Sequence, residues 1–184
     1  MGDQTELIFN SENGSEIDSY VIGRIKSMIF WVLMIIVSGM ISRDIRVSIV
    51  IAFSIMPIRK TGGGLHFSNE LLCFCLSTFI LTVASKIVAS LSQVSVVLII
   101  LSGLSALSLW IIGCVDNENR KLSNCEKKFF RSVTSLLVFT EEIVALMLLI
   151  NNCLKYSNSI FAGITISSLL QAVGLFVSVK RKWR

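Results

Sequence analysis

The sequence is short of the residues that a soluble protein uses to meet water and to turn its chain. Charged residues make up 16% of the 184 residues, whereas soluble domains carry about 25%. Proline occurs once, at Pro57, and histidine once, at His66. Hydrophobic residues make up 53% of the chain, and its mean hydropathy is +0.76. These values exclude a soluble globular domain and indicate an integral membrane protein.

The sequence also lacks the alternation of apolar and polar residues that marks the strands of a membrane β-barrel. Backbone groups in lipid must then be hydrogen-bonded within helices. We therefore predict an all-α, polytopic membrane protein that forms one domain over residues 1–184. About six helical segments are expected, because the chain has apolar windows at residues 27–42, 45–58, 69–90, 93–114, 133–150 and 158–179.

The length of each window indicates whether its helix crosses the bilayer. A span needs about 20 apolar residues. Windows 69–90, 93–114 and 158–179 reach this length and window 133–150 comes close, so we expect four spans there. Windows 27–42 and 45–58 are short, so their helices are expected to tilt, to enter the membrane partway or to be buried against other helices.

The N-terminal region is acidic, whereas a secretory signal peptide begins with basic residues. No cleaved signal is therefore expected. Ser15 is a suitable N-cap, and apolar residues recur at helical spacing after it. Residues 15–26 are expected to form an amphipathic helix on the membrane surface, or else the start of the first spanning helix.

Most lysine and arginine residues lie in every second connection between the apolar windows. The N-terminal region, the 59–68 loop, the 115–132 loop and the C-terminus hold most of them, so the positive-inside rule places these parts on the cytoplasmic side of the cell membrane. Arg43 and Arg46 fit this topology least well. The net charge of +5 is explained by basic loops beside anionic lipid and requires no nucleic acid.

The five cysteines are an odd number and lie in apolar windows or cytoplasmic loops, so free thiols are expected rather than a disulfide framework. Cys73 and Cys75 are two residues apart, and such side chains on a helix point about 200° apart. They are therefore poor metal ligands, and no metal or other cofactor is expected.

The single imidazole of the chain precedes one of these thiols. His66 lies seven residues before Cys73, and the two are candidates for a thiol–imidazole catalytic pair. A straight helix would separate them by about 10 Å along its axis, which is too far for a hydrogen bond. Three glycines come just before the histidine: Gly62, Gly63 and Gly64. Such a run suits a turn that brings His66 back towards Cys73.

Ser68 is expected to cap a helix that starts at Asn69, with Glu70 in its first turn. Cys73 would then lie one turn inside the helix, near the positive end of its dipole, which favours a thiolate. His66 would act first as the base and then as the imidazolium partner. The alternatives are that Cys73 is a small packing residue and that His66 is a hydrogen-bonded surface residue.

This run resembles the accessory gene regulator B (AgrB) family of membrane cysteine endopeptidases, which process the precursors of quorum-sensing peptides. The family motif holds a basic residue, a glycine run, a hydrophobic residue, the catalytic histidine and, after six residues, the catalytic cysteine. The matching positions are Arg59, Gly62 to Gly64, Leu65, His66 and Cys73. The polar loop that starts at Asp116 and the basic C-terminus are also similar, whereas Leu65 and Cys114-Val115 depart from the family pattern.

The resemblance implies cleavage of a short precursor peptide, similar to AgrD, at the cytoplasmic face of the bacterial cell membrane. Cys73 would attack the carbonyl at the processing site and expel the acidic tail, leaving a thioester acyl-enzyme. A cysteine or serine of the peptide would then close a thiolactone or lactone ring. Backbone N–H groups of the glycine run, or of Phe67 and Ser68, would receive the oxyanion. The ring size, and whether the protein forms a homodimer, stay open.

Other polar residues suggest supporting roles. The candidates for contact with the acidic tail are Arg59, Lys60, Arg120 and Lys121. Charge within an apolar window is costly and marks a buried pair or a polar cavity, so Lys86 is a candidate partner of Glu141 or Glu142. A third catalytic residue would come from Asn151, Asn152 or Gln171, and the sequence does not choose among them.

Two functions without covalent chemistry stay open. In a transporter or channel, His66 and the charged residues of the apolar windows would handle ions or an exported peptide. In a helical scaffold, the glycine run would be only a turn. The sequence contains neither duplicated halves nor paired broken helices, which disfavours a transporter.

Overall fold

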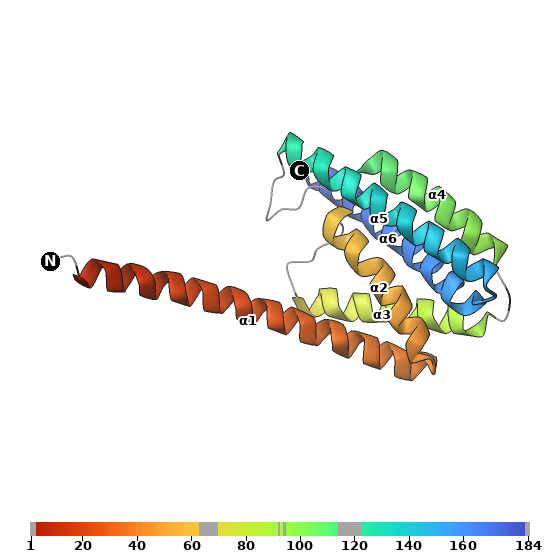
Figure 1. Cartoon of the computed structure of the whole chain (residues 1–184), viewed down its shortest axis with the longest axis horizontal. Coiled ribbons are helices and arrows are strands. Elements are labelled where there is room, and N and C mark those ends of the chain that lie inside the picture. The colour runs from red at the N-terminus through yellow and green to blue at the C-terminus, as the bar shows by residue number, and fades with distance from the viewer. Residues whose placement is uncertain (1–2, 63–69, 92, 94, 114–122, 183–184) are drawn as a thin grey trace. The chain divides into compact units, whose positions relative to one another are not determined.

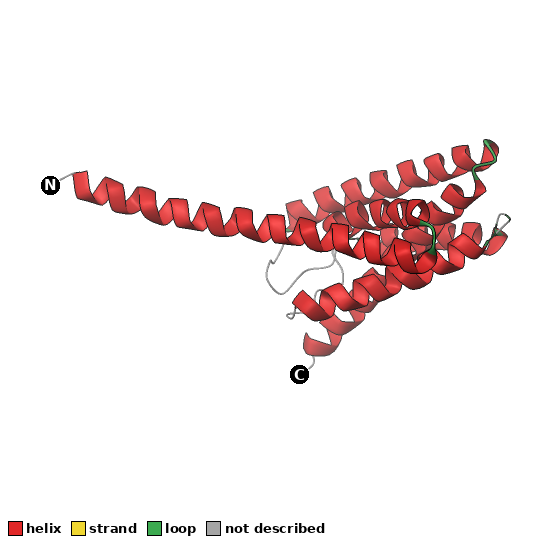
Figure 2. Cartoon of the chain, turned by 90° about the horizontal axis from the view of Figure 1, so that it is seen from below, coloured by secondary structure: helices red, strands yellow, loops and turns green. Residues whose placement is uncertain are grey.

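The computed structural model describes residues 3–62, 70–91, 93, 95–113 and 123–182. In this part of the chain, helix is the only regular secondary structure (Figure 2). The helices are α1 (Asp3–Ser42), α2 (Ile45–Gly62), α3 (Glu70–Ser90), α4 (Val96–Ile112), α5 (Asn124–Ile150) and α6 (Leu154–Lys182) (Figure 1). The prediction of an all-α chain with about six helical segments is therefore confirmed.

Within the described residues, four helices are long and apolar enough to cross a membrane. They contain the segments Val21–Ser42, Leu71–Ser90, Asn124–Ile150 and Leu154–Phe176. The expected number of spans is confirmed, but their identity differs at one place. The first helix is long enough to span, whereas the window at 93–114 yields a shorter apolar helix, Val96–Ile112. The chain is thus a multi-pass membrane protein.

Capping residues explain why two helices differ from their apolar windows. Ser95 starts α4 by accepting a hydrogen bond from the Leu98 N–H over 3.4 Å. Gly113 ends it at φ 69°, a conformation that favours glycine. α5 begins well before window 133–150 because Ser123 and Glu126 form a capping box, in which each side chain accepts a hydrogen bond from the other's backbone N–H.

α1 runs from Asp3 to Ser42 without a break, so residues 15–26 belong to this long helix. Residues 15–26 are thus continuous with the first apolar helix, whose segment able to cross a membrane begins at Val21. Residues 1–34 form one compact unit and residues 35–184 a second. The first unit contains most of α1, and the second contains the end of α1 together with α2 to α6.

α6 is the central helix of the second unit. It contacts α2, α3, α4 and α5, and 56% of its apolar segment is buried, against 17% for the segments of α3 and α5. The main apolar core contains Ile58, Leu109, Val138, Ala145, Ile160, Phe161 and Ile164. α2 approaches α6 closely, because a Cβ atom on Gly163 would lie 2.6 Å from the Ser54 Oγ. Small residues permit such contacts between membrane helices.

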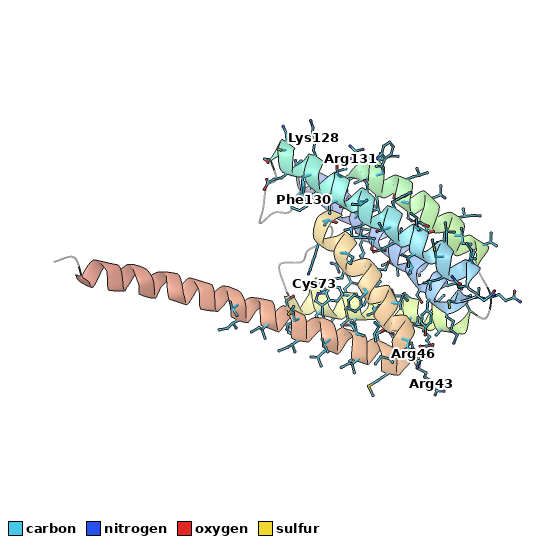
Figure 3. The ribbon with its side chains drawn as sticks, in the orientation of Figure 1. Arg43, Arg46, Cys73, Lys128, Phe130 and Arg131 are labelled. Atoms are coloured by element: carbon cyan, nitrogen blue, oxygen red, sulfur yellow. The ribbon has the colours of Figure 1, made fainter. Side chains whose placement is uncertain are left out.

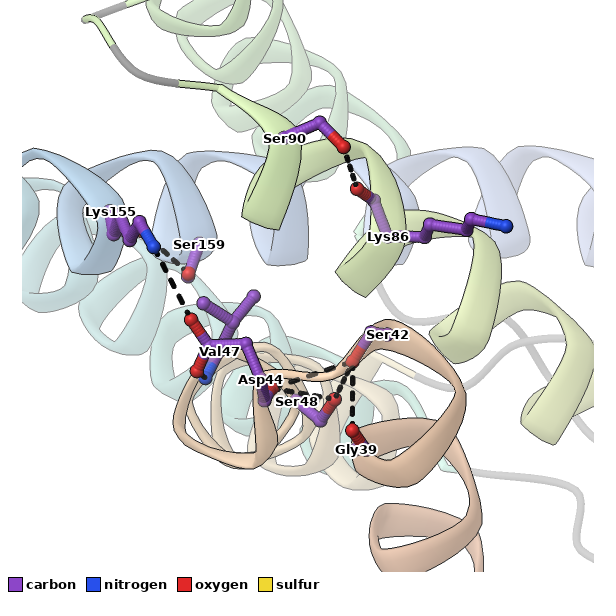
Figure 4. Close-up of polar contacts among 9 residues, drawn as sticks. All are labelled: Gly39, Ser42, Asp44, Val47, Ser48, Lys86, Ser90, Lys155 and Ser159. Carbon is purple, nitrogen blue, oxygen red and sulfur yellow. Dashed lines mark hydrogen bonds and ion pairs between the residues drawn. The ribbon is translucent and has the colours of Figure 1, made fainter.

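Polar side chains at the start of α2 contact residues of α1 and α6 (Figure 4). The Ser48 Oγ lies 3.0 Å from the Ser85 Oγ on α3 and 3.3 Å from the Ser42 Oγ at the end of α1. Asp44, just before α2, has its carboxylate 3.6 Å from the Lys155 Nζ on α6. The buried serine hydroxyls thus have hydrogen-bond partners, as buried polar groups require, whereas the Lys155 side chain is exposed.

Candidate active site

The helices bring the predicted nucleophile and several basic residues to one end of the second unit. α2 and α4 end there, and α3 and α5 begin there (Figure 1). Cys73 lies at the start of α3, while Lys128 and Arg131 lie at the start of α5 (Figure 3). Arg43 and Arg46 lie at the opposite end of α2 (Figure 3). The fold thus separates two groups of basic residues that the sequence assigns to different sides of the membrane.

Cys73 belongs to the face of α3 that packs against the other helices. α3 starts at Glu70, close to the expected start, so Cys73 lies in its first turns. Cys73 and Ser77 are half-buried, and the same face continues through the buried residues Leu81, Ser85 and Val88. Cys75 is exposed, because two residues turn a helix by about 200°. Of these neighbouring thiols, Cys73 is the one that faces the protein.

Arg59 on α2 is held against the same face of α3. Its Nη1 donates a hydrogen bond to the Ser77 Oγ over 3.3 Å. Ser77 follows Cys73 by four residues, so the two lie on one face of α3, about 6 Å apart along the helix axis. Arg59 therefore contacts the residue that lies one helical turn after Cys73.

The end of α2 is also joined to α5. The Thr61 Oγ1 lies 2.9 Å from the Thr134 Oγ1, and it donates a hydrogen bond to the Pro57 carbonyl over 3.1 Å. Pro57 has no N–H group, so the helix loses one backbone hydrogen bond in this region. The last turns of α2 are thus fixed between α3 and α5.

Several predicted site residues lie outside the described residues: Gly63, Gly64, His66, Ser68, Arg120 and Lys121. The pairing of His66 with Cys73 therefore stays a prediction. Gly62 is the last residue of α2, and Lys60 is exposed on its last turn. Arg59, Lys60 and Cys73 are the predicted site residues whose side chains the structure places at one end of the unit.

The candidates for a third catalytic residue separate into two groups. Asn151 and Asn152 lie between α5 and α6, at the end of the unit opposite to Cys73. Gln171 is buried in α6, and its Nε2 donates a hydrogen bond to the Gly113 carbonyl at the end of α4. Of the three, Gln171 lies towards the end of the unit that contains Cys73.

Glu141 of α5 contacts a serine rather than Lys86. The Glu141 Oε2 accepts a hydrogen bond from the Ser54 Oγ on α2 over 2.5 Å. Glu142, the next residue, has its Oε1 buried with no hydrogen-bond partner among the described residues. Lys86 is exposed on α3, and the described residues do not pair it with a glutamate.

The thiols and acidic side chains of the described residues are not arranged as metal ligands. Cys73, Cys75, Cys125 and Cys153 are free thiols. In the part of the chain that the structure describes, no three His, Cys, Asp or Glu side chains converge as metal ligands. The described geometry thus offers a half-buried free thiol one helical turn from the serine that Arg59 contacts.

Comparison with known proteins gives the family. The model of the family described as AgrB, accessory gene regulator B, matches residues 2–175. No curated protein and no solved structure matches the chain. Proteins of this family are membrane peptidase-like proteins that process the AgrD precursor of an autoinducing peptide. Because the match covers nearly the whole sequence, the chain belongs to the accessory gene regulator B family.

Proposed function

We propose that this chain is a membrane-embedded cysteine endopeptidase, a single AgrB-like domain over residues 1–184, which removes the C-terminal tail of an AgrD-like precursor. Cys73 is the nucleophile and His66 the base. The observation that carries the proposal is the position of Cys73, half-buried at the start of α3 and on the face that meets Arg59 through Ser77. Family membership supports the choice of substrate.

The reaction proceeds in two acyl transfers. His66 takes the thiol proton and the Cys73 thiolate adds to the carbonyl at the processing site. The C–N bond then breaks, the imidazolium gives its proton to the leaving amine, and the tail departs from a thioester acyl-enzyme. A cysteine or serine of the retained peptide attacks the thioester, which frees Cys73 and closes a thiolactone or lactone ring.

The surroundings of Cys73 suit this sequence of steps. Exchange of one thioester for another is nearly isoenergetic, whereas hydrolysis is downhill, so water has to be kept from the acyl-enzyme. Cys73 lies between Leu72 and Phe74 in an apolar segment long enough to cross the membrane. Backbone N–H groups of the glycine run, or near Ser68, receive the developing oxyanion.

The basic residues around the site attract the acidic tail. Arg59 and Lys60 lie on the last turns of α2. We assign the same role to Arg120 and Lys121 of the polar loop, which lie outside the described residues. We place this end of the protein at the cytoplasmic face, in line with the positive-inside rule. The amphipathic leader of the precursor then lies on the inner membrane surface, and its tail reaches the site from the cytoplasm.

Replacement of single thiols tests the proposal. The protein is reconstituted in lipid vesicles with an AgrD-like precursor peptide, and release of the tail is followed by mass spectrometry. Cys73→Ala should abolish cleavage, whereas Cys75→Ala, the matched control on the exposed face of α3, should cleave as the wild type does. Cleavage by Cys73→Ala at the wild-type rate would refute the proposal and favour a transporter or a helical scaffold.

A further inference from the structure

We propose that Arg131 and Lys128, near the start of α5, form with Trp110 of α4 a binding site for the phosphate of an anionic phospholipid. The side chains of Arg131 and Trp110 meet where α4 ends and α5 begins. The inference goes beyond the proposed function, because this site binds lipid and takes no part in the cleavage of the peptide.

The Arg131 side chain is held against the end of α4. Its guanidinium carbon lies 5.8 Å from the centre of the Trp110 ring, within the range of a cation–π contact. Its stem passes Gly113, where an added Cβ atom would lie 3.3 Å from the Arg131 Cδ. Neither contact uses an N–H group of the guanidinium as a hydrogen-bond donor. The arginine is thus ordered before it binds an anion, which lowers the entropic cost of binding.

Lys128 supplies a second positive charge on the same side of α5. It precedes Arg131 by three residues, a spacing that makes side chains neighbours on a helix, and both side chains are exposed (Figure 3). In the part of the chain that the structure describes, neither is paired with a carboxylate. Arginine binds phosphate through two parallel hydrogen bonds, and lysine adds a point charge. A phosphate between the two side chains also relieves their mutual repulsion.

The position of Arg131 along α5 matches the level of the lipid phosphates. From residue 132 to its end at Ile150, α5 is about 28 Å long at 1.5 Å per residue, and the hydrocarbon core of a bilayer is about 30 Å thick. A helix that crosses the membrane with this stretch places Arg131 at the border of the headgroups. Trp110, two residues before the end of α4, suits the same border, where tryptophan is enriched.

Exposed apolar side chains continue from this site and favour a lipid over a soluble anion. Leu107 lies one turn before Trp110 on α4, and Leu136 and Phe139 follow Arg131 on α5; all three apolar side chains are exposed. A lipid whose phosphate lies at Arg131 can place its acyl chains along these residues. A soluble phosphate would leave them uncovered.

The fold also separates this site from the predicted nucleophile. α4 contacts α5 and α6, whereas α3, which carries Cys73, contacts α2 and α6. Figure 1 shows α3 and α4 on different sides of α6. An acidic tail that departs at Cys73 is therefore a less suitable occupant than the anionic lipid that surrounds the protein.

Lipid binding by the purified full-length protein tests the proposal. The protein in neutral detergent is titrated with phosphatidylglycerol and, separately, with phosphatidylcholine, and bound lipids are counted by native mass spectrometry. The wild type should bind phosphatidylglycerol more tightly, and Arg131→Gln should raise its Kd about tenfold. The matched control is Arg46→Gln, because Arg46 is also an exposed arginine but lies at the opposite end of α2 (Figure 3); it should bind as the wild type does.

Equal affinity of the wild type for the two lipids, or an equal loss in Arg131→Gln and Arg46→Gln, would overturn the inference. Displacement of the lipid by inorganic phosphate or by an acidic tail peptide at equal concentration would also overturn it. Should Arg131→Gln not accumulate in the membrane, Lys128→Gln gives the same test: a rise in Kd of about fivefold supports the inference, and no rise overturns it. Cys73→Ala should bind both lipids as the wild type does, so this inference and the proposed function fail separately.

Discussion

The Ser54 hydroxyl on α2 donates a hydrogen bond to the Glu141 carboxylate on α5 over 2.5 Å. Ser54 also packs directly against Gly163 on α6. Three helices therefore meet at one serine in the middle of α2. This serine links α2 to α5 and α6, and the end of α2 places Arg59 against Ser77 on α3.

Replacement of Glu141 tests the first of these contacts. Glu141→Leu should destabilise the protein by about 1–3 kcal/mol, because it leaves the buried Ser54 hydroxyl without its acceptor. Glu141→Gln keeps an acceptor oxygen, so its free energy of unfolding should stay close to that of the wild type. Thermal unfolding in detergent measures both. Equal stability of the Leu and Gln variants would show that this hydrogen bond does not hold α2.

A pair of glycine substitutions tests the close contact of α2 with α6. Gly163→Ala should destabilise the protein by about 1–3 kcal/mol, because the new Cβ atom would lie 2.6 Å from the Ser54 Cβ. Gly103→Ala on α4 is the matched control. A Cβ atom there meets nothing within 4 Å, and alanine favours helix over glycine by about 1 kcal/mol. Opposite shifts of the unfolding temperature are expected, and a stable Gly163→Ala variant would contradict the packing.

Asn158 joins the start of α6 to the connection between α3 and α4. Its Nδ2 donates to the Gln93 carbonyl over 3.0 Å, and its Oδ1 accepts from the Ser95 N–H over 3.4 Å. Asn158→Ala should cost about 1–3 kcal/mol, because it leaves backbone groups unpaired. Asn151 is exposed, and its side chain donates to the Met147 carbonyl at the end of the same helix. Asn151→Ala should therefore lower the unfolding free energy far less. Urea unfolding measures both variants, and an equal loss of unfolding free energy in Asn158→Ala and Asn151→Ala would argue against this role of Asn158.

Labelling of single cysteines tests on which side of the membrane each end of α5 lies. Cys125 is exposed near the start of α5, and Asn151 is exposed after its end. In a cysteine-free chain, restored Cys125 should react with a membrane-impermeant maleimide only from the cytoplasmic side, and Asn151→Cys only from the outside. The physical reason is that α5 is long and apolar enough to span the membrane and that its first turns hold Lys127, Lys128 and Arg131. Labelling of both from one side would contradict the topology.

The helices were predictable where an apolar segment has clear ends. The apolar windows predicted the helical class and the number of segments. A run of about 20 apolar residues in lipid must form a helix, because its backbone groups can be hydrogen-bonded only within the segment. The lengths of α1 and α4 were not predictable in this way. α1 extends through its acidic N-terminal part, whereas Ser95 and Gly113 shorten α4, and hydropathy does not register such caps.

The candidate site was predictable only in part. The spacing of Cys73 and Cys75 alone indicated that the two thiols point apart, and the structure confirms that they differ in exposure. Ser77 was overlooked although it lies four residues after Cys73, a spacing that places both on one face. The contact of Ser54 with Glu141 joins residues 87 positions apart, and such pairs depend on how helices pack rather than on local sequence.

Direct detection of the acyl-enzyme tests the central claim, that Cys73 forms a thioester with the precursor. The reconstituted protein is quenched in acid shortly after the precursor is added, and its intact mass is measured. The wild type and Cys75→Ala should both gain the mass of the peptide without its tail, attached at Cys73 and removed by neutral hydroxylamine. Cleavage of the precursor with no such adduct, or an adduct that persists in Cys73→Ala, would contradict the account.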